Sequence, residues 1–348
     1  MLTLFFTCFG FGQNSRPTET KNIKEARKLA KRFLRKQRVP GMSISVSKNN
    51  DLVWSQGFGY ANRKPKVKIK PDKTLFRIAS ISKSITAVAL AKLVDDNLIN
   101  LDESIYTYLP DYPKKEYDFT VRELAGHLAG IRSYKGSEFT LNKKLSISEG
   151  VALFKNDSLL FEPSTQFFYN TFGYVLLSEI MQTVSGTDFV SLVNKSVIDP
   201  LKLTNTMLDA SDITIPNKTN FYRKKRVLST VVSNEYKVAG GGFLSTSENL
   251  IKFGQELILP TLISEQSFLE LTTSQRLKSD NITGYGIGFS VEQTKHNTVK
   301  YYHTGGGVGA STILLICPKE ELVICVLTNR SNISVQFFAE QLESIFID

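Results

Sequence analysis

The stretch Arg77–Leu93, "RIASISKSITAVALAKL", decides the fold. Apolar residues such as Ile85 and Val88 recur at helical spacings, which predicts a helix that opens near Ser80. On a helix, residues three apart share a face, so Ser80 and Lys83 would lie about one turn apart. If Ser80 occupies the first turn, the positive end of the helix dipole also points at anything bound to its oxygen. The pair is either a nucleophile beside its base or two ordinary surface polar residues.

Burial decides between these alternatives. A serine hydroxyl needs a base to become a nucleophile, and a lysine can be that base only if its pKa is lowered. The other interpretation is a helix-capping serine beside a solvated lysine. The apolar neighbours Ile78, Ala79 and Ile81 favour a buried turn.

The spacing alone is weak evidence, because Ser45 and Lys48 match it too. That pair falls in an alternating segment that reads as a strand. Residues three apart on a strand point to opposite faces, so the Lys48 amine cannot reach the Ser45 hydroxyl.

The elements around the central stretch predict an α+β fold. A hairpin is expected over 41–60, broken at Asn49-Asn50-Asp51, and late strands over 283–293, 299–306 and 311–330. The middle of the chain is mostly helical. We therefore expect one domain over 39–348: an antiparallel sheet formed by N- and C-terminal strands, flanked by helices, with a helical insertion over roughly 95–215.

Three local signals place further helices. Thr120 and Glu123 form a capping box before "VRELAGHLAGI", Ser245 and Glu248 cap another helix, and an apolar helix runs through "FGYVLLSEIMQTV". In the last hairpin, a Pro-Lys-Glu-Glu turn sets Cys325 opposite Leu314 and not opposite Cys317. The two cysteines are therefore expected to be buried apolar residues without a disulfide.

The net charge of +10 is concentrated in one segment. Residues 21–38 hold nine basic residues and one acid, Glu25, so they account for +8. An apolar stripe including Ala26, Ala30 and Phe33 makes this a basic amphipathic helix. It is either a helix packed against the body or one lying on an anionic membrane surface. The rest of the chain is nearly neutral, which argues against nucleic acid as a partner.

The first twelve residues, "MLTLFFTCFGFG", predict a signal peptide and hence a secreted or periplasmic protein. Gly10 and Gly12 stand where a signal peptidase expects small residues. The run is short and lacks a charged start, and a mis-set start codon would explain both defects.

Two further motifs reveal a resemblance. Tyr169-Asn170-Thr171 precedes the apolar helix, and His303-Thr304-Gly305 ends a late strand. With Ser80 and Lys83 as SxxK, these motifs fall in the order of the serine β-lactamase and penicillin-binding protein family, in its class C and D-Ala-D-Ala carboxypeptidase branch. Flanking stretches such as "VPGMSISV" and "AGGGFLST" agree, so the chain resembles this family over most of 39–330.

The resemblance implies acyl transfer through a serine ester. Ser80 would attack a carbonyl carbon, while Lys83 and Tyr169 share the proton transfers; which of them is the base stays open. The backbone N–H groups of Ser80 and Gly306 would form the oxyanion hole. His303 completes the catalytic set, and the substrate-binding positions are Thr171, Thr304, Gly305 and Gly306.

Two departures from the family pattern bear on the substrate. Thr171 stands where the family often has asparagine, and His303 stands where β-lactamases commonly have a lysine that supplies a fixed cation. Histidine is mostly neutral at neutral pH. We therefore expect a peptidase or esterase acting on a small-molecule, peptide or ester substrate. A class C-like β-lactamase and a self-associating structural or binding protein are the alternatives, and a homo-oligomer fits either.

The remaining histidines and glycine runs point to no cofactor. His127 is interpreted as a turn or packing residue and His296 as an exposed loop residue. The three histidines lack ligand spacing, so no metal site is expected. "AGGGF" and "GYGIG" do not match phosphate-binding loops and would supply bends near the site.

Overall fold

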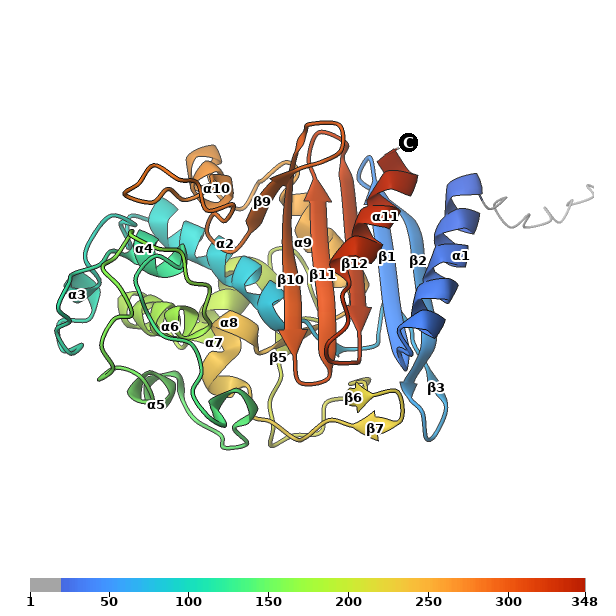
Figure 1. Cartoon of the computed structure of the whole chain (residues 1–348), viewed down its shortest axis with the longest axis horizontal. Helices are drawn as coiled ribbons and strands as arrows, with labels where there is room; N and C mark the ends of the chain where they lie inside the picture. The colour runs from blue at the N-terminus through green and yellow to red at the C-terminus, as the bar shows by residue number, and fades with distance from the viewer. Residues whose placement is uncertain (1–19, 348) are drawn as a thin grey trace, which may run out of the picture.

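A seven-stranded antiparallel sheet runs through the molecule (Figure 1). The computed structural model describes residues 20–347, so the signal peptide predicted for 1–12 lies outside the described residues. N-terminal and C-terminal strands meet at the β1–β12 pair, which confirms the expected α+β architecture. In spatial order the strands are β3 (Val67–Lys68), β2 (Asp51–Asn62), β1 (Gly41–Lys48), β12 (Leu322–Thr328), β11 (Ala310–Cys317), β10 (Val299–Gly307) and β9 (Ser290–Gln293).

Helices cover both faces of this sheet. One face carries α1 (Lys21–Lys36) and α11 (Gln336–Ile347); the other carries α9 (Ser247–Glu256) and the helical half of the molecule around α2 (Ser82–Asp95) (Figure 1). The other α-helices are α3 (Ile105–Tyr108), α4 (Val121–Ala125), α5 (Ile147–Ala152), α6 (Phe172–Ser185), α7 (Phe189–Val193), α8 (Val238–Gly241) and α10 (Glu265–Thr272).

Short turns and small sheets complete the chain. The helical turns are η1 (Ala79–Ile81), η2 (Glu138–Thr140), the π-helical η3 (Asn194–Ile198) and η4 (Glu235–Lys237). A three-stranded sheet is formed by β4 (Phe76–Arg77), β8 (Phe243–Ser245) and β5 (Met207–Leu208), and a two-stranded sheet by β6 (Tyr222–Lys224) and β7 (Val227–Leu228).

Alternation along the central strands divides the core into two layers. On β11, Ile313 and Leu315 pack toward α1 and α11, whereas Leu314 and Ile316 pack toward the helical half. Successive side chains of a strand point to opposite faces, and both faces are covered here, so β11 and β12 are buried along their whole length and are mainly apolar.

The cysteine hairpin has the predicted register. Cys325 lies opposite Leu314, and Cys317 lies opposite Leu322. Both thiols are free and buried, and burial raises the pKa of Cys325 well above its ordinary value. The hairpin therefore serves packing, as the sequence indicated.

The apolar stripe of α1 packs against the rest of the protein. Ala26 and Ala30 are completely buried, and Phe33 stacks on Phe338 of α11 with ring centroids 4.2 Å apart. This packing agrees with the interpretation of α1 as a helix packed against the body of the protein. Any contact of α1 with a membrane would then involve its basic face. None of the helices within residues 20–347 is long and apolar enough to cross a membrane.

Three boundary predictions were wrong. The cap of α9 is Thr246, whose hydroxyl accepts from the Asn249 N–H, and not Ser245. The helix predicted over "VRELAGHLAGI" ends at Ala125, although its Thr120–Glu123 capping box is confirmed. The strand expected over 283–293 is reduced to Ser290–Gln293, because the glycines before it form turns.

Candidate active site

Ser80 lies on a strained turn ahead of α2. The turn η1 has 3₁₀ geometry and the α-helix begins only at Ser82, so Ser80 precedes the first α-helical turn instead of occupying it. Its neighbour Ala79 has φ of +48°, a left-handed conformation that costs free energy for a residue with a side chain. Such strain persists where the surrounding structure enforces it and occurs often at active sites.

Lys83 is buried beside Ser80 and has no carboxylate partner among residues 20–347. Its side chain has no exposed surface, and its Nζ donates to the Gly240 carbonyl at 2.8 Å and lies 3.5 Å from the Ser80 Oγ. Burial lowers the pKa of Lys83 to about 7. The neutral amine is therefore accessible near neutral pH, and that amine can accept a proton.

The second serine–lysine pair is placed as the strand geometry predicts. Ser45 points inward from β1 and shares hydrogen bonds with Ser55 and Ser247 at 3.0 and 2.8 Å. Lys48 is at the end of the same strand, three residues on. Only the Ser80 pair combines a hydroxyl with a buried amine.

Tyr169 lies in the loop before α6, with its ring over the Lys83 amine. The Lys83 Nζ is 4.8 Å from the centre of the Tyr169 ring, and the Ser80 side chain interacts with the phenol. The residue as a whole is 39% exposed, but the surroundings of its hydroxyl group desolvate it and raise its pKa above the ordinary value. The phenol therefore keeps its proton at neutral pH.

His303 is buried on β10 and is neutral. Its Nδ1–H donates to the Thr304 carbonyl at 2.6 Å, so Nε2 accepts from the Tyr285 hydroxyl at 3.0 Å. Burial, with a smaller contribution from the Lys83 charge, lowers the pKa of His303 to about 3. This position supplies no cation.

The strand β10 presents an uncovered edge next to Ser80. Its neighbour β9 pairs only with Val299–Tyr302, so the segment 303–307 continues past β9 and packs against η1. A side chain at Gly305 would meet the Thr312 hydroxyl and the Ile78 carbonyl, whereas one at Gly306 would meet open space. Gly305 is therefore a glycine because of packing, and the open position is Gly306.

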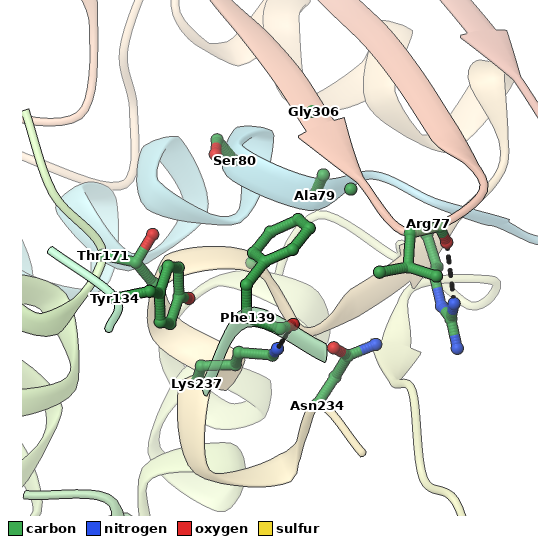
Figure 2. A pocket seen from close by; sticks show the side chains of 13 residues that line it. Arg77, Ala79, Ser80, Tyr134, Phe139, Thr171, Asn234, Lys237 and Gly306 are labelled. Atoms are coloured by element: carbon green, nitrogen blue, oxygen red, sulfur yellow. Dashed lines mark hydrogen bonds between the residues drawn. The ribbon is translucent and has the colours of Figure 1, made fainter. Parts of the chain in front are cut away.

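Two cavities meet at Ser80. Ser80 and Gly306 line both of them. The first, shown in Figure 2, has a volume of about 40 Å³ and the second about 520 Å³. The first is lined by Arg77, Ala79, Ser80, Tyr134, Phe139, Thr171, Asn234, Lys237, Gly240, Gly241, Gly306, Gly307 and Val308. The second is lined by Ser80, Phe167, Tyr169, Thr283, Gly284, Tyr285, Ser290, Glu292, Tyr302, His303, Thr304 and Gly306.

Comparison with known proteins identifies the family of this chain. The Beta-lactamase family model matches residues 26–340. The chain belongs to the β-lactamase family. The human protein "Serine beta-lactamase-like protein LACTB, mitochondrial" is 32% identical over 86% of this chain and 72% of its own length.

Solved structures of the β-lactamase family share the fold. The octameric penicillin-binding protein homologue from Pyrococcus abyssi has a TM-score of 0.82 at 25% identity, covering 93% of this chain and 77% of that one. A class C β-lactamase has a TM-score of 0.80 at 19% identity, covering 93% and 96%.

The two residues that follow Tyr169 in the family's tyrosine motif have different roles in this chain. Asn170 is buried, and its Oδ1 accepts from the Gly173 N–H at 2.6 Å, which holds the start of α6. Thr171 lines the first cavity, where its side chain interacts with Tyr134. The threonine thus faces the position that a substrate would occupy, and the asparagine does not.

His127 packs behind Tyr169 in this β-lactamase-family site. It has φ of +64° and is 1% exposed, and its ring centroid is 4.5 Å from that of Tyr169. The Asn170 N–H donates to its Nδ1 at 3.5 Å. Burial lowers the pKa of His127 well below its ordinary value, so the ring is neutral. Within residues 20–347, no group of three or more His, Cys, Asp or Glu side chains could hold a metal.

Sequence reasoning missed three residues that line the cavities of this family member. Tyr285 fixes the His303 ring, and Arg77 and Lys237 place two basic groups in the first cavity. Lys237 stands directly before the "VAGGGF" stretch, so its closeness to a glycine-rich bend was the available signal. The sequence placed this bend near the site, but it did not indicate that Lys237 would line the cavity.

Proposed function

We propose that the protein is a serine hydrolase that forms an acyl-enzyme on Ser80 and acts on peptides or esters. The observation that carries the proposal is the buried Lys83, with a pKa of about 7, whose Nζ lies 3.5 Å from the Ser80 hydroxyl. A base works best when its pKa lies near the operating pH. The shared family and the order of its motifs support the same reaction class.

The reaction has two halves. Lys83 takes the Ser80 proton as Oγ bonds to the carbonyl carbon, and the backbone N–H groups of Ser80 and Gly306 stabilise the oxyanion. The bond to the leaving group then breaks as that group takes a proton from the Lys83 ammonium, with the neutral Tyr169 hydroxyl as a donor in the network. Water attacks the resulting ester, again with Lys83 as base, and releases the acid and free Ser80.

A peptide or ester substrate fits the second cavity better than a β-lactam does. Its motif residue His303 is neutral, and Glu292 lines the same space. A β-lactam carboxylate would find no fixed cation there. Class C-like β-lactamase activity is therefore the weaker candidate, and cephalosporin turnover at rates typical of dedicated β-lactamases would contradict the preference.

Covalent labelling tests the nucleophile. The wild-type protein should react with a fluorescent fluorophosphonate and gain one adduct mass, whereas Ser80→Ala should lose at least 99% of the labelling. Ser45→Ala is the matched control, because it removes the hydroxyl from the other serine–lysine pair, and it should label like wild type. Labelling that survives in Ser80→Ala would refute the assignment of Ser80.

Two further expectations complete the proposal. Self-association is supported by the octameric state named for the Pyrococcus abyssi homologue, and light scattering of the purified protein would measure it. A secreted or periplasmic location rests on the signal peptide proposed for residues 1–12. N-terminal sequencing of the mature protein tests that cleavage.

A further inference from the structure

Lys237 is a second buried lysine, on the wall of the first cavity opposite Ser80 (Figure 2). It ends η4, is 5% exposed, and its Nζ donates to the Phe139 carbonyl at 3.0 Å. An ammonium group has three N–H donors. Within residues 20–347 this is its one hydrogen bond, and no carboxylate lies within ion-pair distance. Two buried donors are therefore left for another acceptor.

The charges around Lys237 leave a positive excess. Asp209 already pairs with both Arg77 and Lys218. When Lys218 is counted with Lys237 and Arg77, three cations stand against two carboxylates, Asp209 and Glu235. A buried charge without a partner is costly, so a ligand that brings one negative charge would be bound favourably.

The second cavity has the opposite character. There the motif histidine is neutral, and Glu292 is the charged lining residue. An anionic substrate group would therefore enter the first cavity. This cavity is also the smaller one, which suits the acyl half that stays bound to Ser80, while the larger cavity lets the leaving group depart and water enter.

We propose that the first cavity binds a carboxylate on the acyl half of the substrate, with Lys237 as its counter-ion. The inference rests on the proposed acyl-enzyme function and narrows its substrate class to esters or amides of dicarboxylic acids, acidic amino-acid residues included. One positive charge in excess matches one carboxylate. The rings of Tyr134, Phe139 and Tyr236 surround the head of this lysine, with their centroids 5.5–5.6 Å from its Nζ.

Matched ester pairs test the proposal. The 4-nitrophenyl hemiesters of succinate, glutarate and adipate are compared with the butyrate, valerate and caproate esters, in which a methyl group replaces the carboxylate. Spontaneous hydrolysis, including intramolecular attack by the carboxylate, is subtracted. The readout is the ratio of kcat/KM for each anionic ester to that of its neutral partner. For the best length, the wild-type ratio should be about 10 or more, since a hydrogen bond to a charged group gives roughly a tenfold to hundredfold preference.

Variants assign the effect to one side chain. Lys237→Met keeps the apolar stem and should lower the ratio at least tenfold, and Lys237→Arg should keep most of it. Lys144→Met removes a nearby exposed charge that does not line the cavity and should leave the ratio within about twofold. If circular dichroism shows that Lys237→Met does not fold, Lys237→Gln takes its place, and it should also lower the ratio at least tenfold.

The outcomes separate this inference from the proposed function. A wild-type ratio near or below 1, or a ratio unchanged in Lys237→Met, would overturn the carboxylate site while leaving the hydrolase in place. Ester hydrolysis that persists in Ser80→Ala would instead overturn the proposed function.

A pH series gives an independent check. Burial lowers the pKa of Lys237 to about 8, with Arg77 lowering it further and Asp209 and Glu235 raising it. The cation is present below that pKa and lost above it. The ratio should therefore fall as the pH rises from 7 to 9, whereas effects on Ser80 and Lys83 cancel between paired esters. A ratio that stays constant over this range would contradict the assignment.

Discussion

At the scale of single residues, burial separates the two groups that face Ser80. It lowers the pKa of Lys83 to about 7 and raises that of Tyr169 above its ordinary value. Desolvation disfavours the charged form of each, so the amine becomes a base while the phenol remains an acid. The sequence left the identity of the base open because burial of the amine depends on distant segments such as Gly240.

The assignment of Lys83 as the base and Tyr169 as the acid predicts the pH dependence of ester hydrolysis. A base must be deprotonated, so kcat/KM for a neutral nitrophenyl ester should rise about tenfold per pH unit below pH 7 and level off above it. Tyr169→Phe should lower the plateau by about tenfold to hundredfold and leave the midpoint near pH 7. His303 does not add a step near 6.5, because its pKa is lowered to about 3.

A stopped-flow series from pH 5 to pH 9 with both proteins measures this. If Tyr169→Phe removes the rising limb or shifts its midpoint by a unit or more, the phenol belongs to the titrating group. The two residues would then have to be treated as one coupled pair.

At the scale of elements, the site depends on how closely β10 approaches η1. A Cβ at Gly305 would lie 2.1 Å from the Thr312 Oγ1 and 2.4 Å from the Ile78 carbonyl oxygen. Gly305→Ala should therefore push the strand away from the turn, lower the free energy of unfolding by about 1–3 kcal/mol and slow fluorophosphonate labelling of Ser80. Urea denaturation and labelling rates measure the two effects.

The next residue of β10 is the control. A Cβ at Gly306 meets no atom within 4 Å, so Gly306→Ala should change the free energy of unfolding by less than about 0.5 kcal/mol. Equal stability losses in the two variants would mean that the strand tolerates displacement and that packing against η1 does not fix the site.

Some of these elements could be predicted from the sequence, and others could not. Capping and alternation are local, so the Thr120 capping box, the α6 helix and the Cys325–Leu314 register were predictable. The 3₁₀ turn at Ser80 was not, because it is imposed by β10 packing against it. The convergence of Ser80, Lys83, Tyr169 and His303 followed from motif order, whereas the position of Lys237 depends on a loop that folds back across the cavity.

At the scale of the whole molecule, the base is obtained at a cost in stability. Lys83 has no exposed surface, and no carboxylate in the part of the chain that the structure describes pairs with it. Its pKa is 10.5 in the unfolded chain and about 7 in the folded one, so protons bind more tightly to the unfolded state between these values. Proton uptake on unfolding therefore penalises the fold as the pH falls from 10.5 to 7, and the full penalty is present below pH 7.

Lys83→Met should make this cost visible. Methionine keeps the apolar stem without the charge, so the variant should be inactive but more stable than wild type at pH 6. The stability of wild type relative to the variant should rise by roughly 1.4 kcal/mol per pH unit between pH 7 and pH 9. Other groups titrate alike in both proteins and cancel in the difference. Urea denaturation at pH 6, 7.5 and 9 measures this difference in the free energy of unfolding. If the difference does not change with pH, Lys83 is protonated in the folded protein throughout, and it cannot be the proposed base.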